Sequence, residues 1–144
     1  MDKIRIKQVQ GEVAKANIDE FYRKNGSQGT ARNEDLFFVA YSAQKIIGCV
    51  RFCIEEDTPM LRTMYVDTKY RDQGVGRLLL KSFGNYLDIN KIHNVFCLPY
   101  VHLEKFYGLI NFKVVDKKEV PKFLVIRAIE YAQNEIHTLF MRRL

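Results

Sequence analysis

The stretch that decides the fold is residues 61–87, LRTMYVDTKYRDQGVGRLLLKSFGNYL. Residues 61–66 are rich in apolar and β-favouring side chains, which predicts a buried strand. A polar loop follows at 67–73 and leads into Gly74-Val75-Gly76. Beyond the glycines the apolar residues recur at helical spacing, so we predict an amphipathic helix over 76–87.

A strand, a glycine loop and a helix in this order can bind an anion. The N-terminus of a helix presents unbonded backbone N–H groups and the positive end of the helix dipole. Gly74 and Gly76 let the backbone approach a ligand closely, and Lys69, Arg71 and Arg77 add positive charge around the turn. We therefore predict a phosphate-binding turn. The alternative is a tight turn whose glycines serve packing alone.

Two common phosphate-binding motifs do not fit this turn. A dinucleotide-binding loop has G-x-G-x-x-G directly after its strand, whereas Leu79 stands at the third glycine position here. Seven residues also separate Val66 from Gly74. A P-loop needs Gly-Lys followed by Ser or Thr, which the turn lacks.

The sequence Arg71-Asp72-Gln73-Gly74-Val75-Gly76 resembles the R-x-x-G-x-G signature of the GNAT superfamily of acetyl-CoA-dependent N-acetyltransferases. The hydrophobic strand that ends in Val66-Asp67 and the Leu-Leu pair after the glycines are also similar to that family. G-x-G on its own is a weak motif, but its position between a predicted strand and a predicted helix supports the functional interpretation.

A second segment supports the resemblance. Phe106-Tyr107-Gly108-Leu109-Ile110-Asn111-Phe112 is similar to the family's F/L-Y-x-x-x-G-F segment, with Asn111 in place of the glycine. Asn tolerates the left-handed conformation that a helix C-cap requires, so we expect that conformation at Asn111. Tyr100 stands where many members carry an Asn that hydrogen-bonds the pantetheine arm, which leaves that contact without its usual residue.

The remaining sequence predicts further strands and helices. Alternating apolar residues predict a first strand that ends at Gly11, and Gly48 marks a bulge in the third strand. Residues 121–133 fit a strand or a helix, and we favour a helix or an irregular crossover. The predicted strands are 3–9, 35–41, 45–56, 61–66, 93–98, 112–115 and 136–144; the predicted helices are 13–24, 76–87 and 101–109; residues 27–34 are a loop and 42–44 a hairpin turn.

This order of elements resembles the GNAT fold. The resemblance implies an α/β (mixed α+β) fold with a central mixed, mostly antiparallel sheet of six to seven strands. The sheet would be split after strand 4 and flanked by helices, with the cofactor in the gap. We expect a single domain over residues 1–144, because a chain of this length buries about two-thirds of its unfolded surface.

Composition and charge indicate in which compartment the protein resides and which classes of partner it can bind. No apolar run approaches the ~20 residues of a membrane span, and the N-terminus lacks the apolar core of a signal peptide. With three cysteines and no zinc-like spacing, we expect a cytoplasmic protein with reduced thiols and no metal. The net charge of +6 suits an anionic cofactor, and without a nucleic-acid-binding motif we expect no nucleic-acid and no membrane partner.

The resemblance implies direct transfer of an acetyl group from acetyl-CoA to a primary amine. Backbone groups of Met64, Tyr65 and Val66 would pair with the pantetheine arm like an extra strand and help polarise the thioester carbonyl. The pyrophosphate would be held by the turn, that is by Arg71, Asp72, Gln73, Gly74, Val75, Gly76 and Arg77.

Two catalytic roles are needed, and the resemblance supplies one of them. Tyr107 matches the tyrosine that commonly protonates the departing thiolate in this family; a phenol of pKa about 10 is protonated at neutral pH, and a thiol has a pKa of about 8.5. An alkylammonium must lose a proton before it attacks, at a cost of about 4–5 kcal/mol at pH 7. A base or a water relay should therefore exist. Glu55 and Glu56, at the end of the predicted third strand, are the nearest candidate bases by topology, and Glu55 is our choice; solvated strand-end charges are the alternative.

Other functions are compatible with parts of the sequence. A non-catalytic acetyl-CoA-binding module acting on a protein partner would keep the glycine turn but would not need Tyr107. A nucleic-acid-binding module gains only from the net charge. The acceptor amine, on a small molecule or a protein, is not specified by the sequence. In folds of this kind a terminal strand can be shared between subunits, which is compatible with a homodimer.

Overall fold

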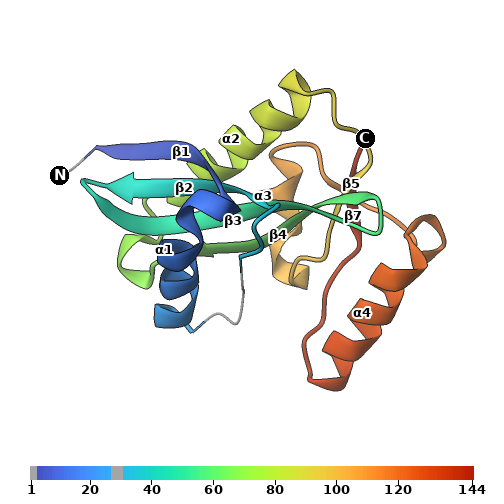
Figure 1. The fold of residues 1–144 in the computed structure, drawn as a ribbon. Helices are drawn as coiled ribbons and strands as arrows, with labels where there is room; N and C mark the ends of the chain where they lie inside the picture. Colours follow the sequence, from blue (N-terminus) through green and yellow to red (C-terminus); the bar gives the residue numbers. More distant parts are fainter. Residues whose placement is uncertain (1–2, 27–30) are drawn as a thin grey trace.

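A sheet of seven strands in the order β1-β2-β3-β4-β5-β7-β6 forms the centre of the protein (Figure 1). The computed structural model describes residues 3–26 and 31–144. Neighbouring strands run antiparallel except β4 and β5, which are parallel. The strands are β1 (Ile4–Gln10), β2 (Leu36–Ser42), β3 (Lys45–Glu55), β4 (Thr58–Val66), β5 (Val95–Cys97), β6 (Lys113–Val114) and β7 (Met141–Arg143).

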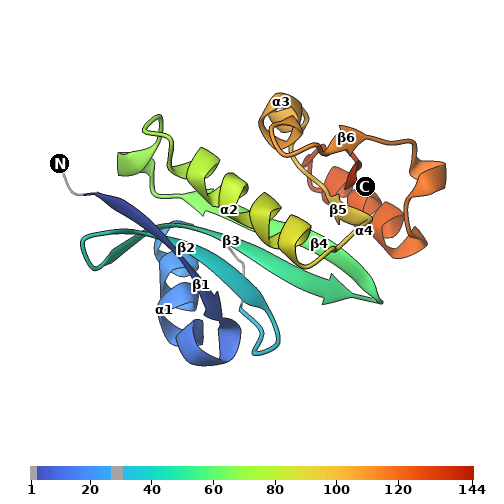
Figure 2. The same ribbon diagram turned by 90° about the horizontal axis from the view of Figure 1, so that it is seen from above.

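Helices lie on both faces of the sheet (Figure 2). The first helix packs on one face of β2 and β3, and the second helix packs on the opposite face. No helix within the described ranges is long and apolar enough to cross a lipid bilayer. The helices are α1 (Gly11–Lys24), α2 (Val75–Ile89), α3 (Glu104–Gly108) and α4 (Lys122–Gln133), with short 3-10 turns at Thr68–Tyr70, Val101–Leu103 and Lys117–Glu119.

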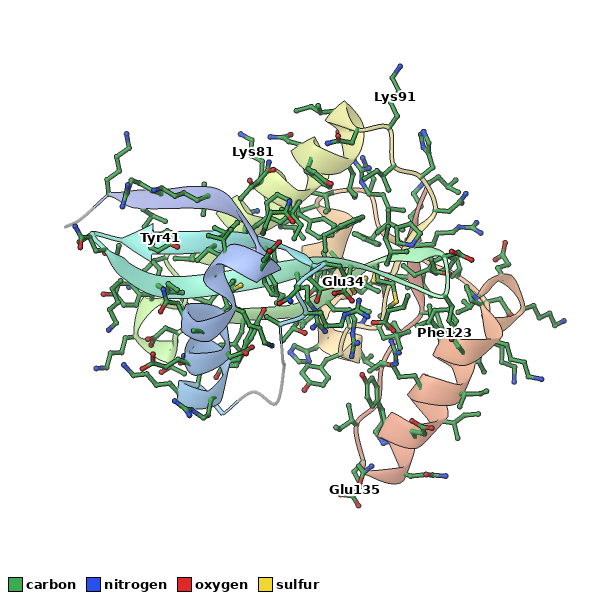
Figure 3. The ribbon with its side chains drawn as sticks, viewed as in Figure 1. Glu34, Tyr41, Lys81, Lys91, Phe123 and Glu135 are labelled. Atoms are coloured by element: carbon green, nitrogen blue, oxygen red, sulfur yellow. The ribbon has the colours of Figure 1, made fainter. Side chains whose placement is uncertain are left out.

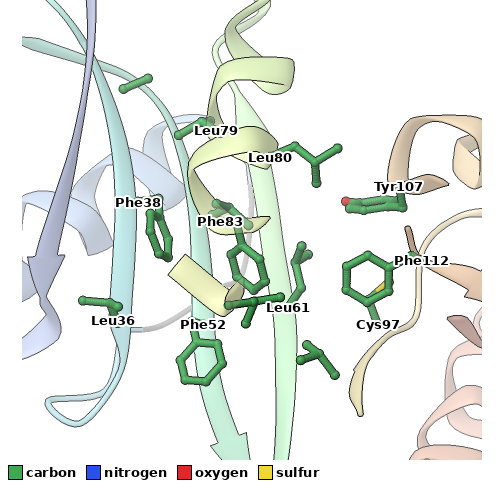
Figure 4. Close-up of a cluster of buried hydrophobic side chains, with 14 of the residues drawn as sticks. Leu36, Phe38, Phe52, Leu61, Leu79, Leu80, Phe83, Cys97, Tyr107 and Phe112 are labelled. Carbon is green, nitrogen blue, oxygen red and sulfur yellow. The ribbon is translucent and has the colours of Figure 1, made fainter. Parts of the chain in front are cut away.

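Strand β2 is buried on both faces, which explains its nearly continuous apolar sequence, LFFVAYS. Phe38 points toward α2, where its ring lies 5.4 Å from that of Phe83 (Figure 4). Phe37 points the other way and joins Ile18 and Tyr22 of α1 in a second cluster. The alternation of side chains along one strand therefore builds both hydrophobic cores.

The sheet splits between β4 and β5, as predicted. These two strands pair only at Met60 and Phe96, so β4 beyond Met60 has one edge without a strand partner among the described residues. A β-bulge lies in the same region, because β3 pairs with β4 at Cys49–Tyr65 and then at Arg51–Arg62. The bulge and the single β4–β5 pairing together open a gap in the middle of the sheet.

Most predicted elements are present, with changed boundaries. Residues 121–133 form helix α4 rather than a strand. The predicted final strand 136–144 shortens to β7, and the predicted helix 101–109 divides into a 3-10 turn and α3. The bulge predicted at Gly48 is confirmed by a register shift there. Of the predicted loop 27–34, residues 27–30 lie outside the described residues.

Gly11 has a different role from the predicted one. It begins helix α1 immediately after β1, two residues earlier than the predicted helix start. A Cβ atom at Gly11 would lie 2.0 Å from the carbonyl oxygen of Arg32, which no side chain could occupy. Glycine is therefore required by the close approach of two backbone segments, and it does not prevent the helix from forming.

Candidate functional site

A large cleft opens where β4 and β5 separate. Its volume is about 1480 Å³, and its walls come from β3, β4, β5, α4 and the segment leading into α3. Four residues predicted for the site, Glu55, Met64, Tyr65 and Tyr107, line this one cleft. Val66 and the turn 71–77 do not line it.

A side chain of helix α1 donates a hydrogen bond to the bulge in β4. Thr63 has φ of 52°, an uncommon value for a β-branched residue, and its carbonyl accepts a hydrogen bond of 2.8 Å from the Tyr22 hydroxyl. Tyr65 and Val66 pair with β3 on one side of the strand. The opposite edge faces the gap, so its N–H and C=O groups are placed to pair with an extended ligand.

The glycine turn leads from β4 into α2. Gly74 has φ of 83° and caps the helix without a side-chain hydrogen bond. The first backbone hydrogen bond of the helix runs from the Leu78 N–H to the Gly74 carbonyl, at 3.1 Å. The N–H groups of Val75, Gly76 and Arg77 precede this bond and lie at the positive end of the helix.

Side chains of the turn fix its position against β4. The Nε atom of Arg71 donates to the Val66 carbonyl at 3.0 Å, and its guanidinium lies 5.1 Å from the centre of the Tyr65 ring. Asp72 adopts φ of 63°, and Gln73 donates to the Lys69 carbonyl at 3.2 Å. The anion-binding end of α2 is thus fastened to the end of the open strand.

The turn also lies against α3, the helix that carries Tyr107. A Cβ atom on Gly76 would be 3.3 Å from the Phe106 ring, so the glycine allows the two helices to approach each other. At the end of α3, Asn111 has φ of 72°, which confirms its predicted left-handed conformation. The Phe112 N–H closes this cap on the Tyr107 carbonyl at 3.3 Å.

Tyr107 lies inside the wall of the cleft. Its side chain is 5% exposed. Its ring packs edge-on against the rings of Phe106 and Phe112, with centre-to-centre distances of 5.0 and 6.3 Å. Figure 4 shows its hydroxyl directed toward the side of α2. Burial raises the pKa of Tyr107 well above its usual value, and the neighbouring Cys97 thiol adds to this effect. The phenol therefore stays protonated throughout the neutral range.

Glu55 is bound by two guanidinium groups. Nη1 of Arg62 lies 2.7 Å from Oε1 of the carboxylate, and Nη2 of Arg127 lies 2.5 Å from Oε2. Burial alone would raise the pKa of Glu55, but hydrogen bonds from Arg127 and Arg62 outweigh it and lower the pKa to about 2. Glu55 as the general base stays a prediction, and a pKa this low weighs against it.

The arginines of the cleft were not singled out from the sequence. Arg32, Arg51, Arg62 and Arg127 all line it, together with Tyr131 of α4. Arg127 and Tyr131 are four residues apart, which places them on the same face of a helix, and this spacing was the one local indication that they act together. Among the described residues, no group of three or more His, Cys, Asp or Glu side chains is placed to hold a metal ion.

A mixed sheet split beside a glycine turn is the architecture of an acyltransferase domain, and the sequence agrees. The family model for the acetyltransferase (GNAT) domain matches residues 33–114, more than half of the chain. The protein therefore belongs to the GNAT acetyltransferase family. No curated protein sequence matches the chain.

Solved structures share the fold at low sequence identity. N-acetylglutamate synthase from Neisseria gonorrhoeae, in complex with coenzyme A and N-acetyl-glutamate, superposes with a TM-score of 0.66 and 17% identity. The match covers 99% of this chain and 35% of that one, so the chain spans about a third of the synthase.

Two further structures match over nearly their whole length. PaiA N-acetyltransferase from Thermoplasma acidophilum, in complex with coenzyme A, has a TM-score of 0.65 and 15% identity over 98% of both chains. An acetyltransferase of the GNAT family from Staphylococcus aureus has a TM-score of 0.61 and 15% identity, also over 98% of both chains. These likenesses establish the fold.

Proposed function

We propose that the protein transfers the acetyl group of acetyl-CoA to a primary amine by direct attack of the amine on the thioester. One observation carries this proposal: the open edge of β4 runs from the cleft to the N-terminus of α2. An extended arm and a pyrophosphate need these two features in this order. The coenzyme A complexes of the synthase and of PaiA support the same ligand.

The residues present fit this cosubstrate. Backbone groups of Met64, Tyr65 and Val66 would pair with the pantetheine arm as an added strand. The free N–H groups of Val75, Gly76 and Arg77 would bind the pyrophosphate, and the guanidinium groups of Arg71 and Arg77 would balance its charge. Asp72, Gln73 and Gly74 would give the turn its shape.

The chemistry needs one new bond and one broken bond. The amine nitrogen attacks the thioester carbon, a C–N bond forms, and the C–S bond breaks to release the thiolate. Backbone N–H groups on the open edge of β4 would stabilise the oxyanion of the tetrahedral intermediate. Tyr107 would donate its phenolic proton to the thiolate. The ammonium loses two protons on becoming an amide; they would leave through water or through Glu55, and one of them would restore the Tyr107 phenol.

Thermal unfolding with and without acetyl-CoA tests this proposal. A ligand at 100 times its dissociation constant stabilises a protein by about 2.7 kcal/mol, which raises the unfolding temperature of a domain this size by several degrees. Gly74→Glu places a carboxylate on the turn, where a Cβ atom meets no atom within 4 Å, and should lose the shift while still folded. Gly74→Lys is the matched control, because it imposes the same backbone strain at φ of 83° without placing a negative charge beside the expected pyrophosphate.

Two results decide the matter. The proposal requires a shift that Gly74→Lys keeps and Gly74→Glu loses. No shift at millimolar acetyl-CoA would contradict it. With cofactor binding established, release of the coenzyme A thiol in the presence of a panel of amines would test the transfer itself.

A further inference from the structure

Arginine is the most frequent charged residue in the lining of the cleft. Four arginines line the cleft, and most of their ion pairs involve only two carboxylates. Arg62 and Arg127 share Glu55, while Arg32 and Arg51 share the fully buried Asp35. The remaining acid in the lining is Glu56, which is exposed at the turn between β3 and β4. Glu55 and Asp35 therefore each pair with two arginines, and Arg32 also pairs with Glu34.

Arg62 and Arg127 retain donors that can bind a ligand. Each gives a single nitrogen to Glu55, and Nη2 of Arg62 also lies 3.4 Å from the Tyr131 hydroxyl. A guanidinium has five N–H donors, and the described residues use only part of them at these two positions. Because Tyr131 accepts from Arg62, its own hydroxyl hydrogen is available to an acceptor in the cleft.

The elements that hold this cluster come from distant parts of the chain. Glu55 ends β3, Arg62 lies on β4, and Arg127 and Tyr131 lie on α4. Figure 3 shows Phe123 at the end of α4 nearest the sheet, and the Arg127 guanidinium lies 5.6 Å from its ring centre. The side chains of Arg62 and Arg127 are 29% and 22% exposed, so both are ordered by contacts yet reach the cleft.

The cluster also lies at a suitable distance from the expected thioester. Arg62 is two residues before Met64 on β4, so their Cα atoms lie at most about 7 Å apart, and the bulge at Thr63 shortens this path. A group held by Arg62 would leave an amine of the same small molecule beside the open edge of the strand. A guanidinium fork matches the two oxygens of a carboxylate.

We propose that the acceptor is a small primary amine that also bears a carboxylate, and that Arg62, Arg127 and Tyr131 bind this carboxylate. The proposal rests on the proposed acetyl transfer and names the substrate class. The same charges disfavour a polyamine or an aminoglycoside, since such a cation would face two guanidinium groups that share one carboxylate.

Acetylation of matched acceptor pairs tests the proposal. Each proteinogenic amino acid is compared with its own carboxamide, with spermidine and phosphoethanolamine added, and release of the coenzyme A thiol is followed. We expect at least one amino acid whose kcat/KM exceeds that of its amide by about 100-fold or more. Similar rates for acid and amide, or a preference for spermidine or phosphoethanolamine, would overturn the proposal.

Variants then assign the residues. Arg62→Met and Arg127→Met should each raise KM for the acid by about 100-fold and leave KM for the amide unchanged, while Arg62→Lys should restore part of the loss. Tyr131→Phe should raise KM by about tenfold. Arg23→Met, on the exposed surface of α1, is the control and should change neither KM for the acid nor KM for the amide. An equal loss for acid and amide would assign the arginines to structure alone.

Stabilisation by acetyl-CoA, measured on every variant, separates the two proposals. If acetyl-CoA stabilises the protein but no amino acid is acetylated, and none raises the unfolding temperature of the coenzyme A complex, the carboxylate proposal fails and cofactor binding stands. If acetyl-CoA does not stabilise the unmodified protein, the proposed function itself fails.

Discussion

Arg127 on α4 donates a hydrogen bond to Glu55 on β3, across 72 positions of sequence. Leu124 is the one fully buried side chain of α4, and Phe123 and Val125 pack partly buried against the same cluster; the ion pair adds a polar contact between the helix and the sheet. The same contact forms one wall of the cleft. Attachment of α4 and the charge of the acceptor region therefore depend on the same carboxylate.

The pH dependence of stability should report this ion pair. The pKa of Glu55 is lowered from 4.5 to about 2, so its stabilising contribution is complete above pH 4.5 and is lost as the pH falls toward 2. Glu55→Gln should lower the free energy of unfolding by roughly 2–3 kcal/mol at pH 7, because two guanidinium groups lose their partner. Denaturant unfolding at pH 7, 5, 4 and 3 should show the difference from wild type shrinking below pH 4.5. A difference that is the same at every pH would contradict this origin.

Truncation of a buried side chain of α4 should lower the free energy of unfolding much more than truncation of an exposed one. Leu124 is fully buried, whereas Ile129 on the same helix is 55% exposed. Leu124→Ala should lower the free energy of unfolding by about 2–5 kcal/mol, through lost apolar burial and the cavity left behind. Ile129→Ala should cost well under half of that, since its side chain already contacts water. Denaturant titrations of both variants check this, and equal losses would mean that α4 is not docked through Leu124.

The fold was predictable because its strongest signals are local. The apolar run of β2, the helical spacing after Gly76 and the positive φ at Asn111 each depend on residues close in sequence. The length of the final strand was overestimated for the same reason. Residues 136–144 carry enough apolar side chains for a strand, but within them Thr138 forms only an isolated bridge to Tyr100 and regular pairing begins at Met141.

The charged part of the site could not be predicted in this way. Glu55 was predicted as the base because the end of the third strand lies nearest the site by topology, and nothing near it in sequence indicates two arginine partners. Arg62 is seven residues away and Arg127 is 72 residues away, and α4 brings the second one back to the sheet. The pKa of a carboxyl group depends on such tertiary neighbours, so its role cannot be read from the strand alone.

The effect of Gly74 on protein stability should be separable from its effect on cofactor binding. Gly74 and Gly26 have φ of 83° and 78°, and a Cβ atom at either would meet no atom within 4 Å. Alanine at each position should therefore cost about 1 kcal/mol of stability through backbone strain alone. Only Gly74→Ala should also reduce stabilisation by acetyl-CoA, because its methyl group would stand on the turn that we expect to bind the pyrophosphate. Equal stabilisation of the two variants by acetyl-CoA would place the pyrophosphate elsewhere.

The hydroxyl of Tyr22 should stabilise the bulge in β4. It is fully buried and donates to the Thr63 carbonyl at 2.8 Å. Tyr22→Phe leaves that carbonyl without this donor and should cost about 1–3 kcal/mol in thermal or denaturant unfolding. Tyr86→Phe is the control, because Tyr86 packs through its ring on Phe38 and Phe52 and its hydroxyl bonds to none of the described residues. The two variants should differ by at least about 1 kcal/mol, and equal stability would mean that the bulge does not need this bond.

Removal of the Tyr107 hydroxyl should slow acetyl transfer without weakening cofactor binding. Tyr107→Phe keeps the ring contacts with Phe106 and Phe112, so stabilisation by acetyl-CoA should not change. Loss of the proton donor should lower kcat by about 100-fold or more, measured with any accepted amine. Burial raises the pKa of Tyr107 above its usual value, and the protonated form is the active one, so wild-type activity should show no fall from this residue up to about pH 10. Tyr86→Phe should retain full activity, and a Tyr107→Phe variant with wild-type kcat would assign Tyr107 to packing.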